Sequence, residues 1–327
     1  MLSSARGLVR TDLALEAREA LLQKTRDKVI GVDSTTRTTA HTRVTKVKVT
    51  SEAGARRLGK PPGTYITIEA PELRQGSRVV ASETAEVLAE ELGALANLPE
   101  KASILVIGLG NWNATPDALG PRVVDTVMVT RHLFEYAPQE LKGGLRSVAA
   151  LAPGVLGLTG IETEEIVKGV VDRIKPDLVV AVDALAARSL ERVCTTVQLT
   201  DSGIHPGSGI GNKRLGLTEE SLGVRVIGIG VPTVIHASTL VSDALGLMLG
   251  RLEKTGAESG GNLSRIFSPA ERERLVHELL PGQWEDLFIT PKEIDALIAD
   301  AARVIASGLN AALHPGIKAG QGEYYLQ

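Results

Sequence analysis

Two aspartates stand where a carboxyl group can do chemistry. Asp117 lies in the segment GNWNATPDALGP (110–121), between a predicted strand and a predicted helix, and Asp183 directly follows the apolar run LVVAV (178–182). A carboxyl group that ends a buried strand is partly desolvated, which disfavours its ionised form, whereas a helix amino terminus favours that form. Two carboxyl groups in such different settings can divide the work, one deprotonating a water and the other donating a proton to a carbonyl oxygen. The pair predicts the chemistry of an aspartic peptidase.

Both aspartates also have a plainer structural explanation. Asp117 comes two residues after Thr115, the expected N-cap, and an aspartate at the start of a helix is most often there for capping. Asp183 could simply close its strand, although active sites gather at the carboxyl edge of a parallel sheet. The sequence leaves open whether the two side chains meet.

Polar residues gather after four of the predicted strands. The carboxyl ends of parallel strands share one edge of a sheet, so we expect these segments to line the same edge. In the first segment, Asn111 and Asn113 could hydrogen-bond the aspartates or the carbonyl of the bond to be cut, or only shape the turn. The third segment contains Asp201 and His205, which could support the aspartates or complete a metal site with them. The four segments are residues 110–121, 183–189, 200–214 and 230–238.

Other motifs of enzyme chemistry are missing from the sequence. It contains neither HExxH nor GxSxG, and GLGNWN lacks the third glycine of a dinucleotide-binding loop. Cys194 is the single cysteine, which excludes an intrachain disulfide and a cysteine-based zinc cluster. Its place in a predicted buried strand indicates an inert small side chain. The glycine-rich HPGSGIGNKR (205–214) could hold an anion with backbone amides, or only have a restrained shape.

The alternation of strands and helices predicts an α/β fold, with a mainly parallel central sheet and helices on both faces. Two segments that alternate apolar and polar residues, 42–50 and 63–70, predict a small antiparallel pair at the edge. Capping sequences place helix starts at Thr159, Ser268 and Thr290. The last helix has an apolar stripe that we expect to dock on the core, namely Ile294, Leu297, Ile298, Ala301, Val304, Ile305 and Leu309. The other expected elements are strands at 103–108, 147–151, 177–182, 193–199 and 224–229, and helices at 11–26, 81–96, 121–135, 160–174 and 234–252.

Composition narrows the class of protein. The chain has 327 residues, of which 43% are hydrophobic and only 3% aromatic, so an aliphatic core is expected. A net charge of −3 gives no electrostatic argument for binding nucleic acid directly. We see no signal peptide and no run of 18 apolar residues, and therefore expect no membrane span. A single cysteine fits a reducing compartment, and nothing in the chain suggests a division into two domains.

Long stretches of the sequence resemble one family, the germination protease (spore protease) of endospore-forming bacteria. The two longest are VIGLGNWNATPDALGPRVVDTVMVTRHLFE (106–135) and KPDLVVAVDALAARSLERVCTTVQLTDSGIHPGSGIGNKR (175–214). The others follow the family's order over nearly the whole chain, namely VRTDLALEA (9–17), APGVLGLTGIET (152–163), VIGIGVPTVIHA (226–237) and ITPKEID…GLNAALH (289–314). Ungapped motifs of this length are highly specific.

The resemblance implies an endopeptidase that degrades small acid-soluble spore proteins, which coat spore DNA, when a spore germinates. The family is regarded as an atypical aspartic peptidase without metal or cofactor, and its two catalytic aspartates match Asp117 and Asp183 here. It shares an α/β fold with the hydrogenase-maturation peptidases and forms homotetramers. The implied location is the cytoplasm of the forespore and the spore core.

The resemblance also implies a zymogen that removes its own amino-terminal segment. The family's substrates are cut in sequences such as Thr-Glu/Phe-Ala-Ser-Glu, where an acidic residue precedes an apolar one. This chain has Thr-Asp-Leu-Ala-Leu-Glu at 11–16, the same pattern of side chains. We therefore expect cleavage between Asp12 and Leu13, with residues 1–12 as the pro-segment and 13–327 as one peptidase domain.

Two alternatives belong to other classes of protein. A metal-dependent peptidase would use Asp117, Asp183 and His205 as ligands, and a chelator would distinguish it. A non-protease would bind a phosphorylated metabolite or nucleotide in its glycine-rich loops, and tight phosphate binding without peptide cleavage would favour it.

Overall fold

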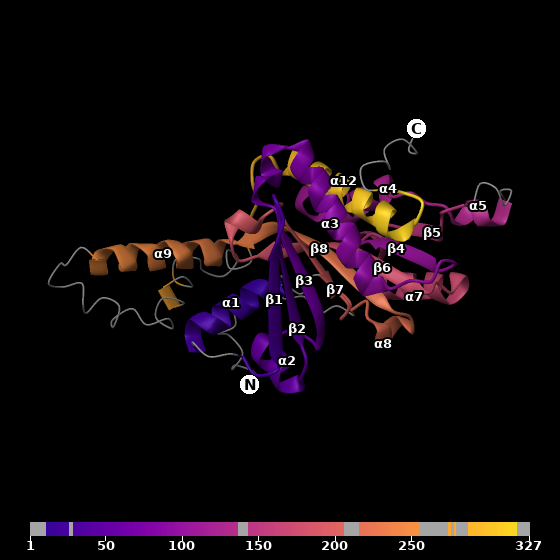
Figure 1. Cartoon of the computed structure of the whole chain (residues 1–327). Helices are drawn as coiled ribbons and strands as arrows, with labels where there is room; N and C mark the ends of the chain where they lie inside the picture. Colours follow the sequence, from indigo (N-terminus) through magenta and orange to yellow (C-terminus); the bar gives the residue numbers. More distant parts are fainter. Residues whose placement is uncertain are drawn as a thin grey trace.

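The computed structural model describes residues 11–25, 29–136, 143–205, 216–254, 274–275, 278 and 287–318. These residues form an α/β fold in which helices cover both faces of a central sheet (Figure 1). The expected fold class is confirmed.

Nine strands of the described residues form one mixed sheet, in the order β1-β2-β3-β7-β8-β6-β4-β5 with β9 paired to β8. Among neighbouring strands only β4–β5, β4–β6 and β6–β8 pair in parallel and the other pairs are antiparallel, so the expectation of a mainly parallel sheet is wrong. β7 runs antiparallel to β8 because the link from β6, residues 188–195, is too short for the crossover that a parallel return needs. The strands are β1 Val32–Thr38, β2 Arg43–Val49, β3 Gly63–Glu69, β4 Ser103–Gly108, β5 Ser147–Leu151, β6 Leu178–Ala187, β7 Thr196–Thr200, β8 Val226–His236 and β9 Phe288–Ile289.

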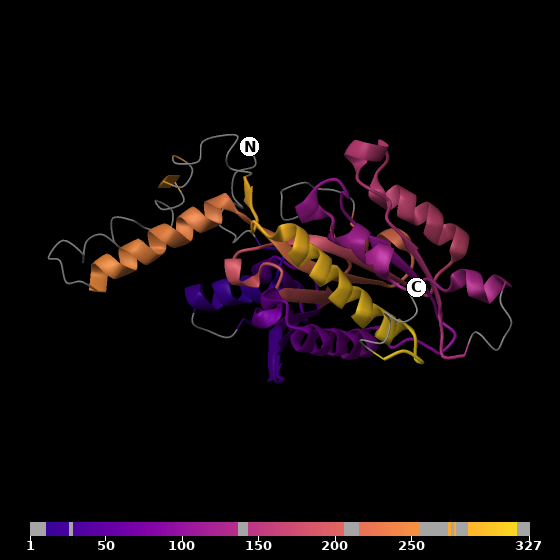
Figure 2. The same cartoon turned by 90° about the horizontal axis from the view of Figure 1, so that it is seen from above.

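Different helices cover the two faces of the sheet. On one face α3, α4 and α12 enclose the largest apolar cluster, while α7 and α8 cover the other face over β4 and β6. On that second face α1 and α2 pack over β2 and β3, and α9 extends away from the sheet in both views (Figures 1 and 2). The helices are α1 Ala14–Thr25, α2 Glu52–Leu58, α3 Arg78–Ala96, α4 Leu119–Thr126, α5 Arg131–Tyr136, α6 Leu156–Thr159, α7 Thr163–Ile174, α8 Glu219–Leu222, α9 Ala237–Lys254 and α12 Ile294–Leu313, with 3-10 turns η1 Pro71–Gln75, η2 Thr115–Asp117 and η4 Leu190–Arg192.

The helix α12 carries the predicted apolar stripe, and all seven residues of that stripe are buried. Its 20 residues are long and apolar enough, by length and composition alone, to cross a membrane. A core helix passes the same test, and 61% of its apolar window is buried against the rest of the protein. The docking of this stripe on the core is confirmed.

Several helix starts differ from expectation. The helix expected at 160–174 begins at Thr163, because Gly160 has a positive φ that ends the short helix α6. Thr159 bonds locally, accepting from the backbone N–H of Ile161, so it does not cap α7. The start of α12 is Ile294, and the Thr290 hydroxyl donates instead to the backbone of β8. The start expected at residue 268 lies outside the described residues.

A close backbone contact joins α4 to the two central parallel strands. A Cβ atom added to Gly120 would lie 2.3 Å from the backbone oxygen of Leu109 and 2.6 Å from that of Val182. Real Cβ atoms do not approach backbone atoms so closely. Only glycine therefore lets the first turn of α4 lie against the ends of β4 and β6, where Asp117 and Asp183 are found.

We predict that Gly120→Ala lowers the free energy of unfolding by about 1–3 kcal/mol, because the added methyl group must displace backbone. Gly169→Ala is the matched control, since a Cβ atom at this helical glycine meets nothing within 4 Å. That change should stabilise the protein by about 0.5–1 kcal/mol. Urea unfolding measures both variants, and equal midpoints for the two would contradict the close contact.

Candidate active site

Asp117 is held by the loop that follows β4. The backbone N–H of Asn111 donates to Oδ2 of Asp117, with an N–O distance of 2.8 Å, and also lies 3.1 Å from the Asp117 backbone oxygen. Gly110 makes this fold possible, because its φ is 116° and a Cβ atom there would lie 2.0 Å from the Asp117 backbone oxygen. A backbone N–H that donates to a carboxylate stabilises its ionised form.

The capping role expected for Thr115 is wrong. Thr115 opens the 3-10 turn η2, whose N-cap is Ala114, and Asp117 ends that turn directly before Ala118, the N-cap of α4. Neither cap residue has a side chain that can accept a hydrogen bond from the helix. Asp117 thus lies at the amino end of α4, where the helix dipole favours a negative charge.

The two asparagines of the loop shape the turn. The Asn111 side chain accepts a hydrogen bond from the backbone N–H of Asn113, with an N–O distance of 2.9 Å. Asn113 is exposed. This is the structural alternative that the sequence left open, and the described hydrogen bonds of both asparagines lie within the loop.

Asp183 lies within β6, not beyond its end. The strand continues to Ala187, while β4 ends at Gly108, which pairs with Val182. Asp183 is therefore the first residue of β6 past its pairing with β4. Its side chain is only 5% exposed, and its Oδ1 accepts a hydrogen bond from the backbone N–H of Ala184 at 2.9 Å.

The structure places both aspartates at the carboxyl edge of neighbouring strands. The backbone N–H of Leu109 donates to the backbone oxygen of Val182 at 2.8 Å, which ties the Asp117 loop to the residue before Asp183. The amino end of α4 rests on the same oxygen through Gly120. Asp117 thus follows the end of β4 as predicted, whereas Asp183 lies inside β6, beside the point where β4 ends.

The other two candidates of the sequence lie elsewhere. Because β7 is antiparallel, Asp201 and His205 follow a strand end that points to the amino ends of β6 and β8, so a common edge for all four polar segments is wrong. Asp201 accepts from the backbone N–H of Thr64 at 2.7 Å, and His205 is exposed. The segment at 230–236 continues β8 and is not a loop. Residues 206–214 lie outside the described residues.

The described part of the chain contains no set of ligands that would support a metal-dependent peptidase. No group of three or more histidine, cysteine, aspartate or glutamate side chains there is placed to hold a metal ion. His205 follows β7, so it does not join Asp117 and Asp183 at their edge.

The residues of the expected cleavage site are bound to β6. The backbone N–H of Asp12 donates to the backbone oxygen of Ala186 at 2.9 Å, and the Asp12 carboxylate accepts the N–H of Ala186 at 2.8 Å. Leu13 is fully buried. Two further side chains that the sequence analysis missed, Lys60 and Gln198, contact the backbone of this segment. Gln198 carried one signal, a carboxamide in a strand otherwise made of threonine, valine and leucine.

A cluster of charges anchors the helix that follows. Glu16 is 3% exposed, and its carboxylate accepts the backbone N–H groups of Arg188 and Ser189 at 2.7 and 3.0 Å. The Arg192 guanidinium lies 3.3 Å from Glu16 and 2.8 Å from Glu19. Burial lowers the pKa of Arg192, but its acidic partners raise it further, and the net direction is upward. The start of α1 is thus tied to the end of β6.

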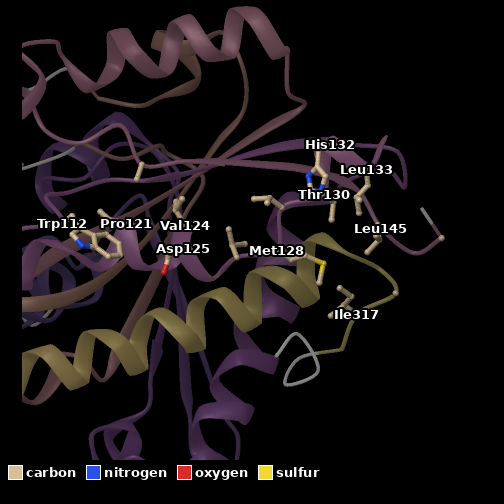
Figure 3. A pocket seen from close by; sticks show the side chains of 15 residues that line it. Trp112, Pro121, Val124, Asp125, Met128, Thr130, His132, Leu133, Leu145 and Ile317 are labelled. Carbon is tan, nitrogen blue, oxygen red and sulfur yellow. The ribbon is translucent and has the colours of Figure 1, made fainter. Parts of the chain in front are cut away.

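An apolar cavity of about 1010 Å³ begins beside the Asp117 loop. Its lining runs from Trp112 and Pro121 along α4 to His132, Leu145 and Ile317 (Figure 3). Neither aspartate lines it, so its size gives no information about catalysis.

These features define an α/β protein with two aspartates near the carboxyl end of β4, one in the loop that follows it and one on the adjacent parallel strand. The family model described as Germination protease matches residues 9–272 and 261–326. A germination protease of Caldanaerobacter subterraneus subsp. tengcongensis is 51% identical over 94% of this chain and 95% of its own. Germination proteases of Clostridium perfringens and Bacillus cereus are 45% and 42% identical, each over 94% of this chain.

The chain belongs to the germination protease family. It is a peptidase, a hydrolase that acts on peptide bonds, with a role in spores. Among solved structures, the [NiFe] hydrogenase maturation protease HycI from Thermococcus kodakarensis KOD1 matches 45% of this chain and 80% of its own, at 24% identity and a TM-score of 0.29. A TM-score this low supports no conclusion about the fold or the function of this chain.

Cys194 is predicted to be inert and dispensable for peptidase activity. It is buried and lies just before β7, and burial raises the pKa of its thiol to about 12. At pH 8 only about one thiol in ten thousand is then ionised, so the folded protein should react with a thiol reagent far more slowly than the unfolded one. Absorbance with a disulfide reagent measures this, and rapid labelling of native protein with loss of activity would contradict it.

Proposed function

We propose that this peptidase is a self-processing endopeptidase of the aspartic type, which degrades small acid-soluble spore proteins during germination. The observation that carries the proposal is the placement of Asp117 and Asp183 at one edge of β4 and β6, with the bond between Asp12 and Leu13 docked on the same strand β6. Family membership supports the substrate, because germination is when stored spore protein is consumed.

The proposed reaction is hydrolysis by a water held between the two carboxyl groups. One carboxylate takes a proton from the water, whose oxygen bonds to the carbonyl carbon, while the protonated partner donates to the carbonyl oxygen. Collapse of this adduct breaks the C–N bond, and the nitrogen of the departing residue receives a proton. The products are a new carboxyl group and a new amino group, and both catalytic groups return to their starting states.

Residues 1–12 are the proposed pro-segment and 13–327 the peptidase domain. Two features of the described segment support this division. Asp12 is bound by both backbone groups of Ala186, three residues from Asp183, so a segment of the chain already occupies the strand edge of the site. Asp12 and Leu13 also have the acidic and apolar character of the bond cut in the proposed substrates.

The proposal includes no metal, no cofactor and no direct binding of nucleic acid by the peptidase. The proposed location is the cytoplasm of the forespore and spore core. The proposed assembly is a homotetramer, and the exposed apolar side chains of the projecting helix α9 support it, namely Leu240, Leu247 and Met248.

Asp117→Asn and Asp183→Asn should each slow loss of residues 1–12 by about 10²–10⁴-fold, because an amide neither accepts nor donates the proton that the reaction moves. Intact-mass analysis of the full chain at mildly acid pH measures the rate. Asp201→Asn is the matched control, since Asp201 contacts Thr64 away from the pair, and its rate should stay within about threefold of wild type.

A chelator should leave the wild-type rate unchanged. Equal clipping in the wild type and in Asp183→Asn would mean that the aspartate is structural, or that a contaminant makes the cut. A product mass that corresponds to another bond would refute the Asp12–Leu13 site alone.

Leu247→Glu should shift the assembly towards smaller species. Leu247 is 72% exposed on α9, so a charge there costs a free subunit little but would be desolvated in an interface. Light scattering after gel filtration gives the mass of each form. A tetramer in both proteins would place the interface elsewhere, and a wild-type monomer would refute the assembly.

A further inference from the structure

Two side chains from separate parts of the chain meet on the backbone around Asp12. Lys60 lies between α2 and β3, and its Nζ donates to the backbone oxygens of Asp12 and Thr11 at 2.9 and 3.2 Å. Gln198 lies in β7, and its Nε2 donates to the same Asp12 oxygen at 3.2 Å. The carbonyl group of the expected scissile bond therefore has two side-chain donors.

Gln198 contacts the backbone on both sides of Leu13. Its Nε2 donates to the carbonyl oxygen of Asp12, and its Oε1 accepts from the backbone N–H of Ala14 at 2.7 Å. One carboxamide thus satisfies one acceptor and one donor of the bound chain, as a neighbouring strand would do. Gln198 is 6% exposed, so its amide has little competition from water. These hydrogen bonds involve only backbone atoms of the bound segment, so they do not depend on its side chains and suit any peptide bound in this register.

The same amide lies on the face of the sheet that carries Asp183. Gln198 and Asp183 both pair with Gly230 of β8, from its two sides. Directly paired residues of neighbouring strands project to the same face, and the Leu185 side chain covers Gly230 between them. Two strand spacings separate the Cα atoms of Asp183 and Gln198 by about 10 Å. The bound carbonyl, its donors and a proposed catalytic carboxylate therefore lie on the same face of the sheet.

Lys60 makes the shorter of the two side-chain hydrogen bonds to this carbonyl oxygen, at 2.9 Å against 3.2 Å for Gln198. Burial lowers the pKa of its amino group, and the nearby carboxylates of Asp12 and Glu16 oppose this shift without reversing it, so the net direction is downward. A donor that is already in place where water is largely excluded contributes most to an oxygen that gains negative charge during reaction.

We propose that Gln198 and Lys60 form the clamp that holds the peptide bond to be cut and stabilises its carbonyl oxygen as water adds. This inference rests on the proposed self-cleavage. Gln198 fixes the backbone on both sides of the bond. Lys60 and Gln198 donate to the carbonyl oxygen while negative charge develops on it, before the protonated carboxyl group gives it a proton. Ala186 binds the acidic side chain before the bond. The clamp serves the chain's own segment first and a peptide of acidic-then-apolar sequence afterwards.

The test compares first-order loss of residues 1–12 in full-length variants by intact mass. Gln198→Met and Lys60→Met keep the approximate size of each side chain but remove its donors, and each should slow cleavage by about 10²-fold or more. Lys60→Arg keeps a charged donor and should stay within about tenfold of wild type. Thr196→Val is the matched control for Gln198, because Thr196 lies two residues away on the same strand and face and its hydroxyl has no hydrogen-bond partner among the residues that the structure describes.

Hydrogen exchange distinguishes a slower reaction of a docked segment from a segment that no longer docks. Each variant is also measured for protection of the backbone N–H groups of Ala186, Arg188 and Ser189, which donate to Asp12 and Glu16 while the segment is docked. Slow cleavage with protection retained in at least one of Gln198→Met and Lys60→Met supports the clamp. Loss of rate that only parallels loss of protection shows an anchor without a catalytic part and overturns it.

Two further outcomes are distinguishable from each other. A wild-type chain that processes normally, with Gln198→Met and Lys60→Met equally fast, overturns the clamp but leaves the aspartic peptidase proposal intact. A wild-type chain that never loses residues 1–12 overturns the clamp together with the proposed self-cleavage.

Discussion

The site depends on which groups form hydrogen bonds with the backbone of β6 beyond the end of β4. β4 stops opposite Val182, but β6 continues to Ala187, and buried backbone groups must find partners. They find them outside the sheet. The N–H of Leu109 reaches Val182, Asp12 pairs with both backbone groups of Ala186, and the Glu16 carboxylate accepts the N–H groups that follow the strand. The Asp117 loop and the amino-terminal segment are thus drawn to the same strand as Asp183.

This arrangement makes the amino-terminal segment both a structural element and a bound peptide. Residues 11–13 lie at the free edge of β6 just before α1 begins at Ala14, with one backbone hydrogen bond to Ala186 and side-chain donors on the Asp12 carbonyl. Self-cleavage as proposed would remove Asp12 from Ala186 and leave Leu13 and Glu16 in place. The same backbone groups would then be open to a peptide from another protein. One set of contacts could therefore serve inhibition first and substrate binding later.

Much of the architecture follows from local sequence. The apolar runs of β4 and β6 predict buried parallel strands, and the stripe of α12 predicts a helix docked on the core, as found. Long motifs predicted the family, which the comparisons show. The errors have local causes as well. The cap-like sequence Thr159–Glu162 does not start a helix, because Gly160 adopts a positive φ and ends α6 there. The strand β7 is antiparallel because the link after β6 is too short for a crossover.

The sequence by itself determined most of the elements, the family and the two candidate aspartates, because apolar periodicity and contiguous motifs are properties of neighbouring residues. Only the tertiary structure decided which polar residues share an edge. Asp201 and Gln198 are three positions apart, yet one caps the start of β3 and the other reaches the backbone of Asp12. Lys60 and Gln198 meet on one carbonyl although 138 positions separate them (198 − 60). Strand direction and side-chain alternation set such meetings, and both arise from long-range pairing that no local pattern records.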